Sequence, residues 1–130
     1  MSLTPTLLIT DDDRDFRESL VAVFDDRGFD TVMASDGVEA CDVVREQQIH
    51  LVLLDYQMPR MTGLEALRLI KQYDQRLPVI LMSSALDEAL SQAARAANAF
   101  AVHSKPVNVA KIRQDVSSAL HSIYNWSADN

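Results

Sequence analysis

Short apolar runs alternate with segments of helical periodicity along the whole chain. The runs of apolar and β-branched residues occupy positions 7–9, 31–33, 51–54, 79–82 and 100–102, and a polar residue follows each of them within two positions. Between the runs, apolar residues recur every three or four positions, as Phe16, Leu20 and Phe24 do. We therefore predict five strands that alternate with five helices.

Polar residues and glycines mark where these helices begin and end. Gly28 is expected to stop the first helix, and Thr62-Gly63 to open the third. The alanine-rich fourth helix is predicted to run from about Asp87 to Ala97, and Asn108 is the expected N-cap of the last helix. The chain thus reads as one βα unit repeated five times.

The strands are continuously apolar, which is typical of strands that helices cover on both faces, as in a parallel sheet. Five βα units can be ordered in several ways. We predict the common one, an α/β, flavodoxin-like, doubly wound (βα)5 three-layer sandwich with a five-stranded parallel sheet of order 2-1-3-4-5. This order makes strands 1, 3, 4 and 5 successive neighbours.

The composition is consistent with one globular domain, and the net charge limits the classes of partner that it can bind. The 130 residues are 48% hydrophobic, enough for a real core, and no apolar run approaches the roughly 20 residues that span a bilayer. Nineteen acidic and twelve basic residues give a net charge of −7, which should repel nucleic acid and anionic lipid. We expect no direct nucleic-acid binding, no membrane association and a cytoplasmic location.

Thiol and zinc chemistry are also disfavoured. Cys41 is the lone cysteine, so no disulfide forms within the chain, and the three histidines have no metal-ligand spacing. His50 and His103 are interpreted as packed or solvated side chains rather than phosphodonors. Phe100 and Met82 are expected in the core.

Polar side chains capable of chemistry follow four of the predicted strands. Asp11 and Asp12 follow the first strand, Asp55 the third, Ser83 the fourth and Lys105 the fifth. Ligands of open α/β sheets bind at the carboxyl ends of the strands. We therefore expect these five side chains to converge.

Three close carboxylates repel one another, so either their pKa values rise or a cation neutralises them. An all-oxygen ligand set favours Mg²⁺, and Mg²⁺ points to phosphoryl chemistry. In that chemistry Asp55 would attack phosphorus, while Lys105 and Ser83 would contact the transferred group. Taken singly, each residue is better explained as a helix cap or a solvated loop residue than as part of a site. Their joint placement on neighbouring strands favours a site.

The same segments resemble the receiver domain of two-component response regulators, in the CheY-like superfamily. The resemblance rests on Leu7–Asp12, Pro78–Ser84, Lys105-Pro106 and the D-x-x-M-P-x-M-x-G pattern of Asp55–Gly63. It implies a receiver domain over residues 6–124, an N-terminal extension over 1–5 and a C-terminal tail over 125–130. The first three residues are also consistent with a cloning remnant.

The resemblance assigns a role to each acidic residue. It makes Asp55 the phosphoacceptor and, with Asp12, a direct ligand of Mg²⁺. Asp11 would hold a metal-bound water, and the backbone carbonyl of Gln57 would complete the protein ligands.

The resemblance also implies a switch and a partner. Ser83 would be the switch hydroxyl and Lys105 the phosphate-binding lysine, preceding a cis peptide bond to Pro106. A histidine kinase or histidine phosphotransfer protein would donate the phosphoryl group, and a downstream protein or linked output domain would receive the signal. The chain would be no enzyme, although it would assist its own phosphorylation and dephosphorylation.

Three positions depart from the family pattern. Asn98 replaces a frequent glycine, and asparagine tolerates a positive φ. Val102 replaces the usual aromatic switch residue, so no large ring can swing inward there. Ala85, two residues after Ser83, offers no side chain to position a hydrolytic water.

Two other functions remain as alternatives. A Mg²⁺-dependent phosphatase of the haloacid dehalogenase type needs a second aspartate two residues after its nucleophile, where this chain has Gln57. A phosphorylation-independent, receiver-like interaction module is disfavoured because all the site residues are present. Tyr124 and Trp126, at the end of the last helix, are expected to cover an apolar edge rather than meet a partner.

Overall fold

The computed structural model describes residues 4–126, in which five strands and five helices alternate strictly. The strands are β1 (Thr6–Thr10), β2 (Asp30–Ala34), β3 (Leu51–Asp55), β4 (Val79–Ser83) and β5 (Ala101–Ser104). The helices are α1 (Arg14–Asp25), α2 (Gly37–Glu46), α3 (Gly63–Tyr73), α4 (Glu88–Ala96) and α5 (Val109–Tyr124). The strands form one parallel sheet of order β2-β1-β3-β4-β5, as the sequence predicts.

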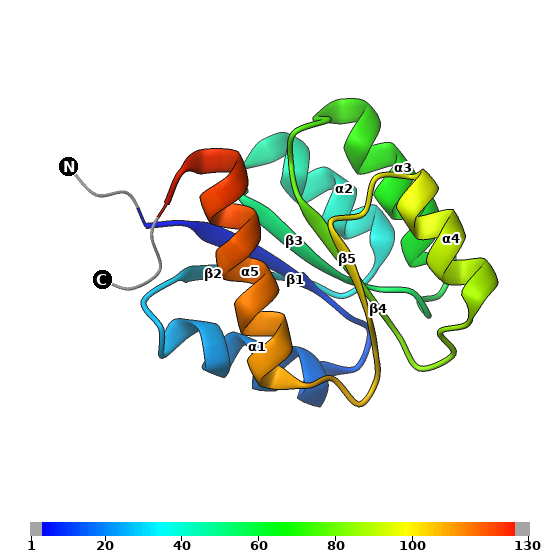
Figure 1. Ribbon diagram of the computed structural model, residues 1–130, viewed down its shortest axis with the longest axis horizontal. Helices are drawn as coiled ribbons and strands as arrows, with labels where there is room; N and C mark the ends of the chain where they lie inside the picture. Colours follow the sequence, from blue (N-terminus) through cyan, green and yellow to red (C-terminus); the bar gives the residue numbers. More distant parts are fainter. Residues whose placement is uncertain (1–3, 127–130) are drawn as a thin grey trace.

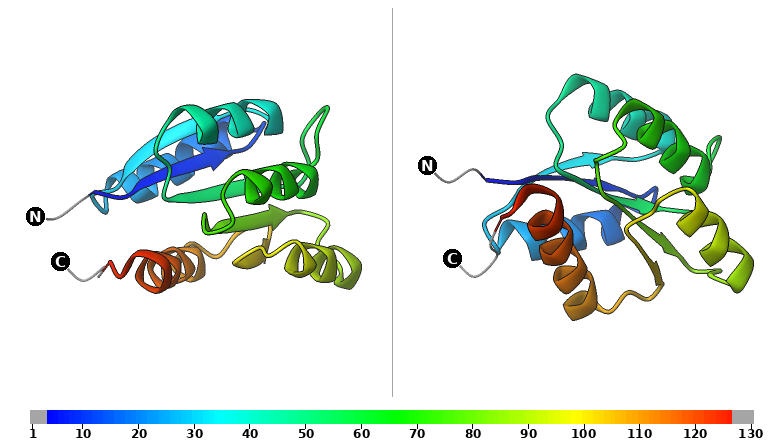
Figure 2. Two further views of the ribbon diagram at one scale, coloured as in Figure 1. Left: turned by 90° about the horizontal axis from the view of Figure 1, so that it is seen from above. Right: turned by 45° about the horizontal axis from the view of Figure 1, so that its top comes forward.

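Helices cover both faces of this sheet (Figures 1 and 2). Helices α1 and α5 pack on one face, and α2, α3 and α4 pack on the other. Successive residues of β3 alternate between the two cores: Leu51 and Leu53 face α1 and α5, whereas Val52 and Leu54 face the other layer. The three-layer sandwich is therefore confirmed.

The two edge strands differ from the expectation that every strand is covered on both faces. All residues of β3 and β4 are buried, but β2 and β5 each contain partly or fully exposed residues. The prediction that Phe100 lies in the core was also wrong, because its side chain precedes β5 and is 38% exposed. An edge strand has a neighbour on one side only, so an apolar run there is not evidence of full burial.

Side-chain caps set the helix boundaries. Asp87 and Asn108 accept N–H groups at the starts of α4 and α5, as predicted. Helix α1 ends at Asp25, three residues before Gly28, which instead adopts a φ of +85° in the turn to β2. Within residues 4–126, no helix has both the length and the apolar character that crossing a bilayer requires.

The start of α3 packs directly against the end of β3. The Gly63 N–H donates to the Tyr56 carbonyl at 2.9 Å. A Cβ added at Gly63 would overlap the backbone carbonyl oxygen of Asp55 and lie 2.8 Å from Tyr56 Cα. Glycine at this position thus lets α3 approach closely enough to fix the backbone of Asp55.

Candidate functional site

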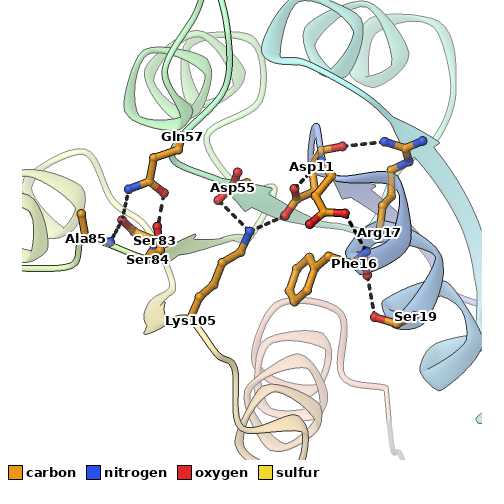
Figure 3. A network of polar contacts seen from close by, with 11 residues as sticks. Asp11, Phe16, Arg17, Ser19, Asp55, Gln57, Ser83, Ser84, Ala85 and Lys105 are labelled. Carbon is orange, nitrogen blue, oxygen red and sulfur yellow. Dashed lines mark hydrogen bonds and ion pairs between the residues drawn. The ribbon is translucent and has the colours of Figure 1, made fainter.

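An acidic cluster lies at the carboxyl ends of β1 and β3 (Figure 3). Asp11, Asp12 and Asp55 each place a carboxylate oxygen within 4.8 Å of the others. Asp11 and Asp55 are buried, whereas Asp12 is exposed. The convergence of the three predicted carboxylates is therefore present in the fold.

Asp11 is held rigidly by neighbours from three elements. Its Oδ1 accepts the N–H of Asp13 at 2.9 Å, and its Oδ2 accepts from Lys105 Nζ at 2.7 Å. Its backbone carbonyl accepts a hydrogen bond from Arg17 at 2.7 Å, and its N–H donates to the Ala34 carbonyl of β2. Each carboxylate oxygen of Asp11 thus accepts one bond from a protein donor and keeps further acceptor capacity.

Lys105 connects the fifth strand to the acidic cluster. Its ammonium lies 2.7 Å from Asp11 Oδ2, 3.1 Å from Asp55 Oδ1 and 4.2 Å from the centroid of the Phe16 ring. The peptide bond from Lys105 to Pro106 is cis, as expected. Burial lowers the pKa of Lys105, but its contacts with the two carboxylates raise it by more, so the net pKa is above its usual value. Lys105 is therefore a cation in the resting site.

Asp55 is a buried carboxylate that lies beside two others. Burial raises its pKa, the charges of Asp11 and Asp12 raise it further, and Lys105 opposes them, which leaves the pKa at about 6. The pair between Asp55 Oδ1 and Lys105 lacks hydrogen-bond geometry, so this buried oxygen accepts no hydrogen bond from the described residues. The positive charge of Lys105 therefore does not fully compensate the negative charges of the three carboxylates.

The donor set fits a magnesium ion. The cluster offers carboxylate oxygens without a nitrogen or sulfur ligand, and Mg²⁺ takes one or two protein carboxylates together with water and phosphate oxygens. Asp55 Oδ1 is buried and accepts no hydrogen bond from the described residues, although it lies 3.1 Å from the Lys105 ammonium. Gln57, the fourth predicted ligand, follows Asp55 by two residues at the same edge of the sheet.

Ser83 is buried at the end of β4, and its hydroxyl is bonded to the following loop. Ser83 Oγ accepts the N–H of Ala85 at 3.0 Å and the side-chain amide of Gln57 at 3.1 Å. The other end of that amide, Gln57 Oε1, accepts the N–H of Ser84 at 3.3 Å. Figure 3 shows this group beside Asp55, on the side away from Asp11.

Three contributions to the site were missed from the sequence. The sequence indicates the backbone carbonyl of Gln57 as a ligand, but it does not indicate the bonds that the Gln57 side chain makes to Ser83 and Ser84. Phe16 was interpreted as part of a core stripe, although it also packs beneath Lys105, and Arg17 was not considered. Phe16 and Arg17 lie in the first turn of the helix that follows Asp11–Asp13, and this nearness to the acidic residues is the feature of the sequence that could have indicated them.

The remaining singled-out residues lie elsewhere. His103 pairs with Asp115 of α5 at 2.6 Å, and His50 packs at the opposite end of the sheet. Asn98 has a φ of +68°, which confirms that this turn needs a residue tolerant of the left-handed conformation. Val102 is partly buried and packs against the α2–α3–α4 core.

Comparisons with known proteins agree with this architecture. The chain is 33% identical over 114 residues to sporulation initiation phosphotransferase F of Bacillus subtilis, and the match covers 88% of this chain and 92% of that protein. Response regulator RR06 of Streptococcus pneumoniae is 38% identical over 82 residues, which are 63% of this chain but 37% of that longer protein.

Solved structures show the same fold. A receiver domain protein of Methanospirillum hungatei superposes with a TM-score of 0.91 over 95% of this chain and 98% of that chain, at 22% identity. The structure of the CheX–CheY–BeF3–Mg²⁺ complex of Borrelia burgdorferi matches with a TM-score of 0.85, 31% identity and 89% coverage of each chain. The family model of the response regulator receiver domain matches residues 7–117. The chain therefore belongs to the receiver domain family of two-component response regulators.

Proposed function

We propose that Asp55 accepts a phosphoryl group from a phosphohistidine of a histidine kinase or histidine phosphotransfer protein. The observation that carries this proposal is the buried Asp55 oxygen, which has no hydrogen bond and lies 3.1 Å from Lys105. An oxygen that is buried at a cost and left without a hydrogen bond is available to form a new bond. The raised pKa of Asp55, about 6, still leaves it mostly ionised at neutral pH.

In the proposed step, a carboxylate oxygen of Asp55 attacks phosphorus. The phosphorus–nitrogen bond of the donor breaks, and its electron pair returns to the histidine nitrogen, which takes a proton from water. Asp12 and Asp55, the Gln57 carbonyl and a water held by Asp11 would bind Mg²⁺. When bound, Mg²⁺ neutralises charge on the carboxylates and on the transferred phosphoryl group.

Lys105 and Ser83 are proposed to contact the transferred phosphoryl group. Lys105 already lies between Asp11 and Asp55, so it needs a small displacement to pair with a phosphoryl oxygen on Asp55. Ser83 ends the strand next to β3, where its hydroxyl can donate to another phosphoryl oxygen. These new contacts exist only in the phosphorylated state, so they can shift the conformation of the surface around Ser83.

The proposal predicts an acyl phosphate that depends on Mg²⁺. Incubation with phosphoramidate should add one phosphoryl group in Mg²⁺ and almost none in EDTA, and hydroxylamine should remove it, as measured by intact mass. Labelling that is equal in EDTA or resistant to hydroxylamine would contradict the mechanism. Continuous turnover of a phosphomonoester would instead favour the phosphatase alternative.

Loss of the Lys105 ammonium should slow this reaction. We expect Lys105→Met to lower the labelling rate by about tenfold or more, because a fixed charge that stabilises the transferred group is removed. Lys111→Met, on the exposed surface of α5, is the matched control and should label at the wild-type rate.

A further inference from the structure

The side chain of Gln57 bridges two loops that the sequence separates by more than twenty residues. Its Nε2 donates to Ser83 Oγ at 3.1 Å, and its Oε1 accepts the N–H of Ser84 at 3.3 Å. Gln57 belongs to the β3–α3 loop, directly after the phosphoacceptor strand, whereas Ser83 and Ser84 begin the β4–α4 loop. Figure 3 shows the amide spanning this gap.

These bonds occupy the acceptor capacity of the Ser83 hydroxyl. A serine oxygen has two lone pairs, and Ser83 Oγ accepts from both Gln57 Nε2 and the N–H of Ala85. Ser83 is completely buried, so breaking either bond leaves a polar group without water to replace it. The oxygen is therefore held toward its own loop.

We propose that Gln57 is a latch that holds Ser83 and the β4–α4 loop in the resting arrangement and opposes the phosphorylated one. The proposal rests on the proposed function, since Ser83 must turn its hydroxyl toward a phosphoryl group on Asp55. In this proposal, turning Ser83 Oγ away from its own loop and toward Asp55 breaks the bond that it accepts from Gln57 Nε2. Gln57 is thus a positioning residue. It raises the free energy needed to reach the phosphorylated arrangement, and it does not contact the phosphoryl group.

Helix α4, which follows the β4–α4 loop, buries little of its surface, so the bonds of Gln57 matter for the position of that loop. Ala94 is the buried residue of α4, and Leu90 and Ala97 are partly buried beside it. A helix with so little buried surface resists displacement weakly. The two bonds of Gln57 therefore add to the few contacts that fix the loop that leads into α4.

The latch can be tested with beryllium fluoride at a fixed Mg²⁺ concentration, as a stable mimic of the phosphoryl group. Gln57→Met keeps the length of the side chain and the backbone carbonyl but removes both hydrogen bonds. We expect this variant to bind beryllium fluoride about fivefold more tightly, the factor that corresponds to one net hydrogen bond. The Mg²⁺ affinity of each variant, measured separately, shows whether the metal contributes to the difference.

A double-mutant cycle ties the effect to Ser83. In a Ser83→Ala background the latch has no hydroxyl to hold, so Gln57→Met should change beryllium fluoride affinity by less than about twofold. A residue that merely supported the fold would weaken binding when replaced, and it would do so in both backgrounds.

Hydrogen exchange gives a readout in the unphosphorylated protein. In Gln57→Met the Ser84 amide loses its acceptor and should exchange about fivefold faster. The Thr6 amide, which bonds to His50 at the other end of the sheet, is the internal control and should be unchanged. Faster exchange at both amides would indicate general loosening and would contradict the latch.

The outcomes separate this proposal from the proposed function. If wild-type protein binds beryllium fluoride and Asp55→Asn does not, the proposed function holds. Equal or weaker binding by Gln57→Met would then overturn the latch alone. If wild-type protein fails to bind beryllium fluoride, the proposed function fails and the latch fails with it.

Discussion

The two ends of the parallel sheet are built on opposite principles. At the carboxyl end, three carboxylates and one lysine converge in a largely buried site, and Asp55 keeps an oxygen without a hydrogen bond. At the amino end, the rings of His50, Tyr124 and Trp126 pack edge to face or tilted, with centroids 4.8–5.4 Å apart. The carboxyl end thus contains charges that are not fully balanced, whereas the amino end contains aromatic rings that pack against one another.

Local structure explains how the aromatic end forms. Asn125 adopts a φ of +61° after α5, so the chain turns back and places Trp126 over His50. His50 Nδ1 accepts the N–H of Thr6 at 2.9 Å, which fixes the ring beside the first residue of β1. Tyr124 and Trp126 pack against the α1–α5 core. The prediction that they cover an apolar edge is therefore confirmed.

The difference between the two ends of the sheet indicates which end can change shape. Moving the aromatic end would expose partly buried rings, whereas the charged end already carries a cost that a bound cation relieves. At the carboxyl end, where chemistry is proposed, a buried carboxylate oxygen lacks a hydrogen bond. At the amino end, the rings contact one another and His50 accepts its hydrogen bond from Thr6.

The largest effect is expected from Gly63→Ala. The added Cβ would overlap the backbone of Asp55 and Tyr56, and backbone cannot move aside as a side chain can. We expect a loss of about 3 kcal/mol in the free energy of unfolding, measured with urea. Gly37→Ala is the matched control, because its Cβ would meet the flexible side chain of Met61 at 3.0 Å and should cost under about 1 kcal/mol. Equal costs would mean that close approach does not fix the charged end.

The next effect is a gain in stability from Asp55→Asn without Mg²⁺. The pKa of Asp55 is about 6 in the folded protein and 3.8 in an unfolded chain, so folding favours its protonated form. The stability linked to this group is fully present below pH 3.8 and is lost as the pH rises through 6. At pH 8 the variant should therefore unfold with about 2–3 kcal/mol more free energy than wild type.

The pH dependence checks this sign. The difference between Asp55→Asn and wild type should shrink steadily between pH 7 and pH 4, and saturating Mg²⁺ should reduce it at pH 8 because bound cation stabilises the wild type by mass action. A difference that is constant with pH would show that the buried carboxylate is not stressed.

A smaller effect is expected from Trp126→Ala at the aromatic end. The substitution removes ring contacts to His50 and Tyr124 but leaves a partly exposed position, so the free energy of unfolding should fall by about 1–2 kcal/mol. Phosphoramidate labelling should keep its wild-type rate, because the ring lies at the end of the sheet remote from Asp55. A slowed reaction would show that the two ends are coupled.

The smallest effect concerns the titration of His50. Burial lowers its pKa in the folded protein below the usual 6.5, so folding favours the neutral ring, which can accept from Thr6. The stability linked to His50 is present above pH 6.5 and is lost as the pH falls below it. His50→Asn keeps an acceptor that does not titrate. Wild type should therefore lose stability relative to this variant between pH 7 and pH 5, in urea unfolding; a difference that does not vary with pH would contradict the neutral-ring account.

Much of the fold and of the site's composition was readable from the sequence, for a physical reason. Helix caps and strand ends are local features, so Asp87, Asn108 and the carboxylates that follow β1 and β3 appear directly in the chain. Parallel pairing then brings the strand ends together without any further information.

The remaining features depend on packing between distant segments. The exposure of Phe100 follows from its place before an edge strand, which apolar character does not reveal. The bridge from Gln57 to Ser83 depends on how two loops meet in space, and a lone glutamine gives no sign of it. The resting contacts of Lys105 likewise combine β1, β3 and α1.

We propose that the buried carboxylate of Asp55 is the group that becomes phosphorylated. The most direct test of this proposal is the intact mass of wild type and Asp55→Asn after incubation with phosphoramidate and Mg²⁺, with folding of both checked by circular dichroism. We predict one added phosphoryl group on wild type and none on the folded variant. Labelling of Asp55→Asn to the wild-type extent would contradict the claim and move the phosphoryl group to another residue.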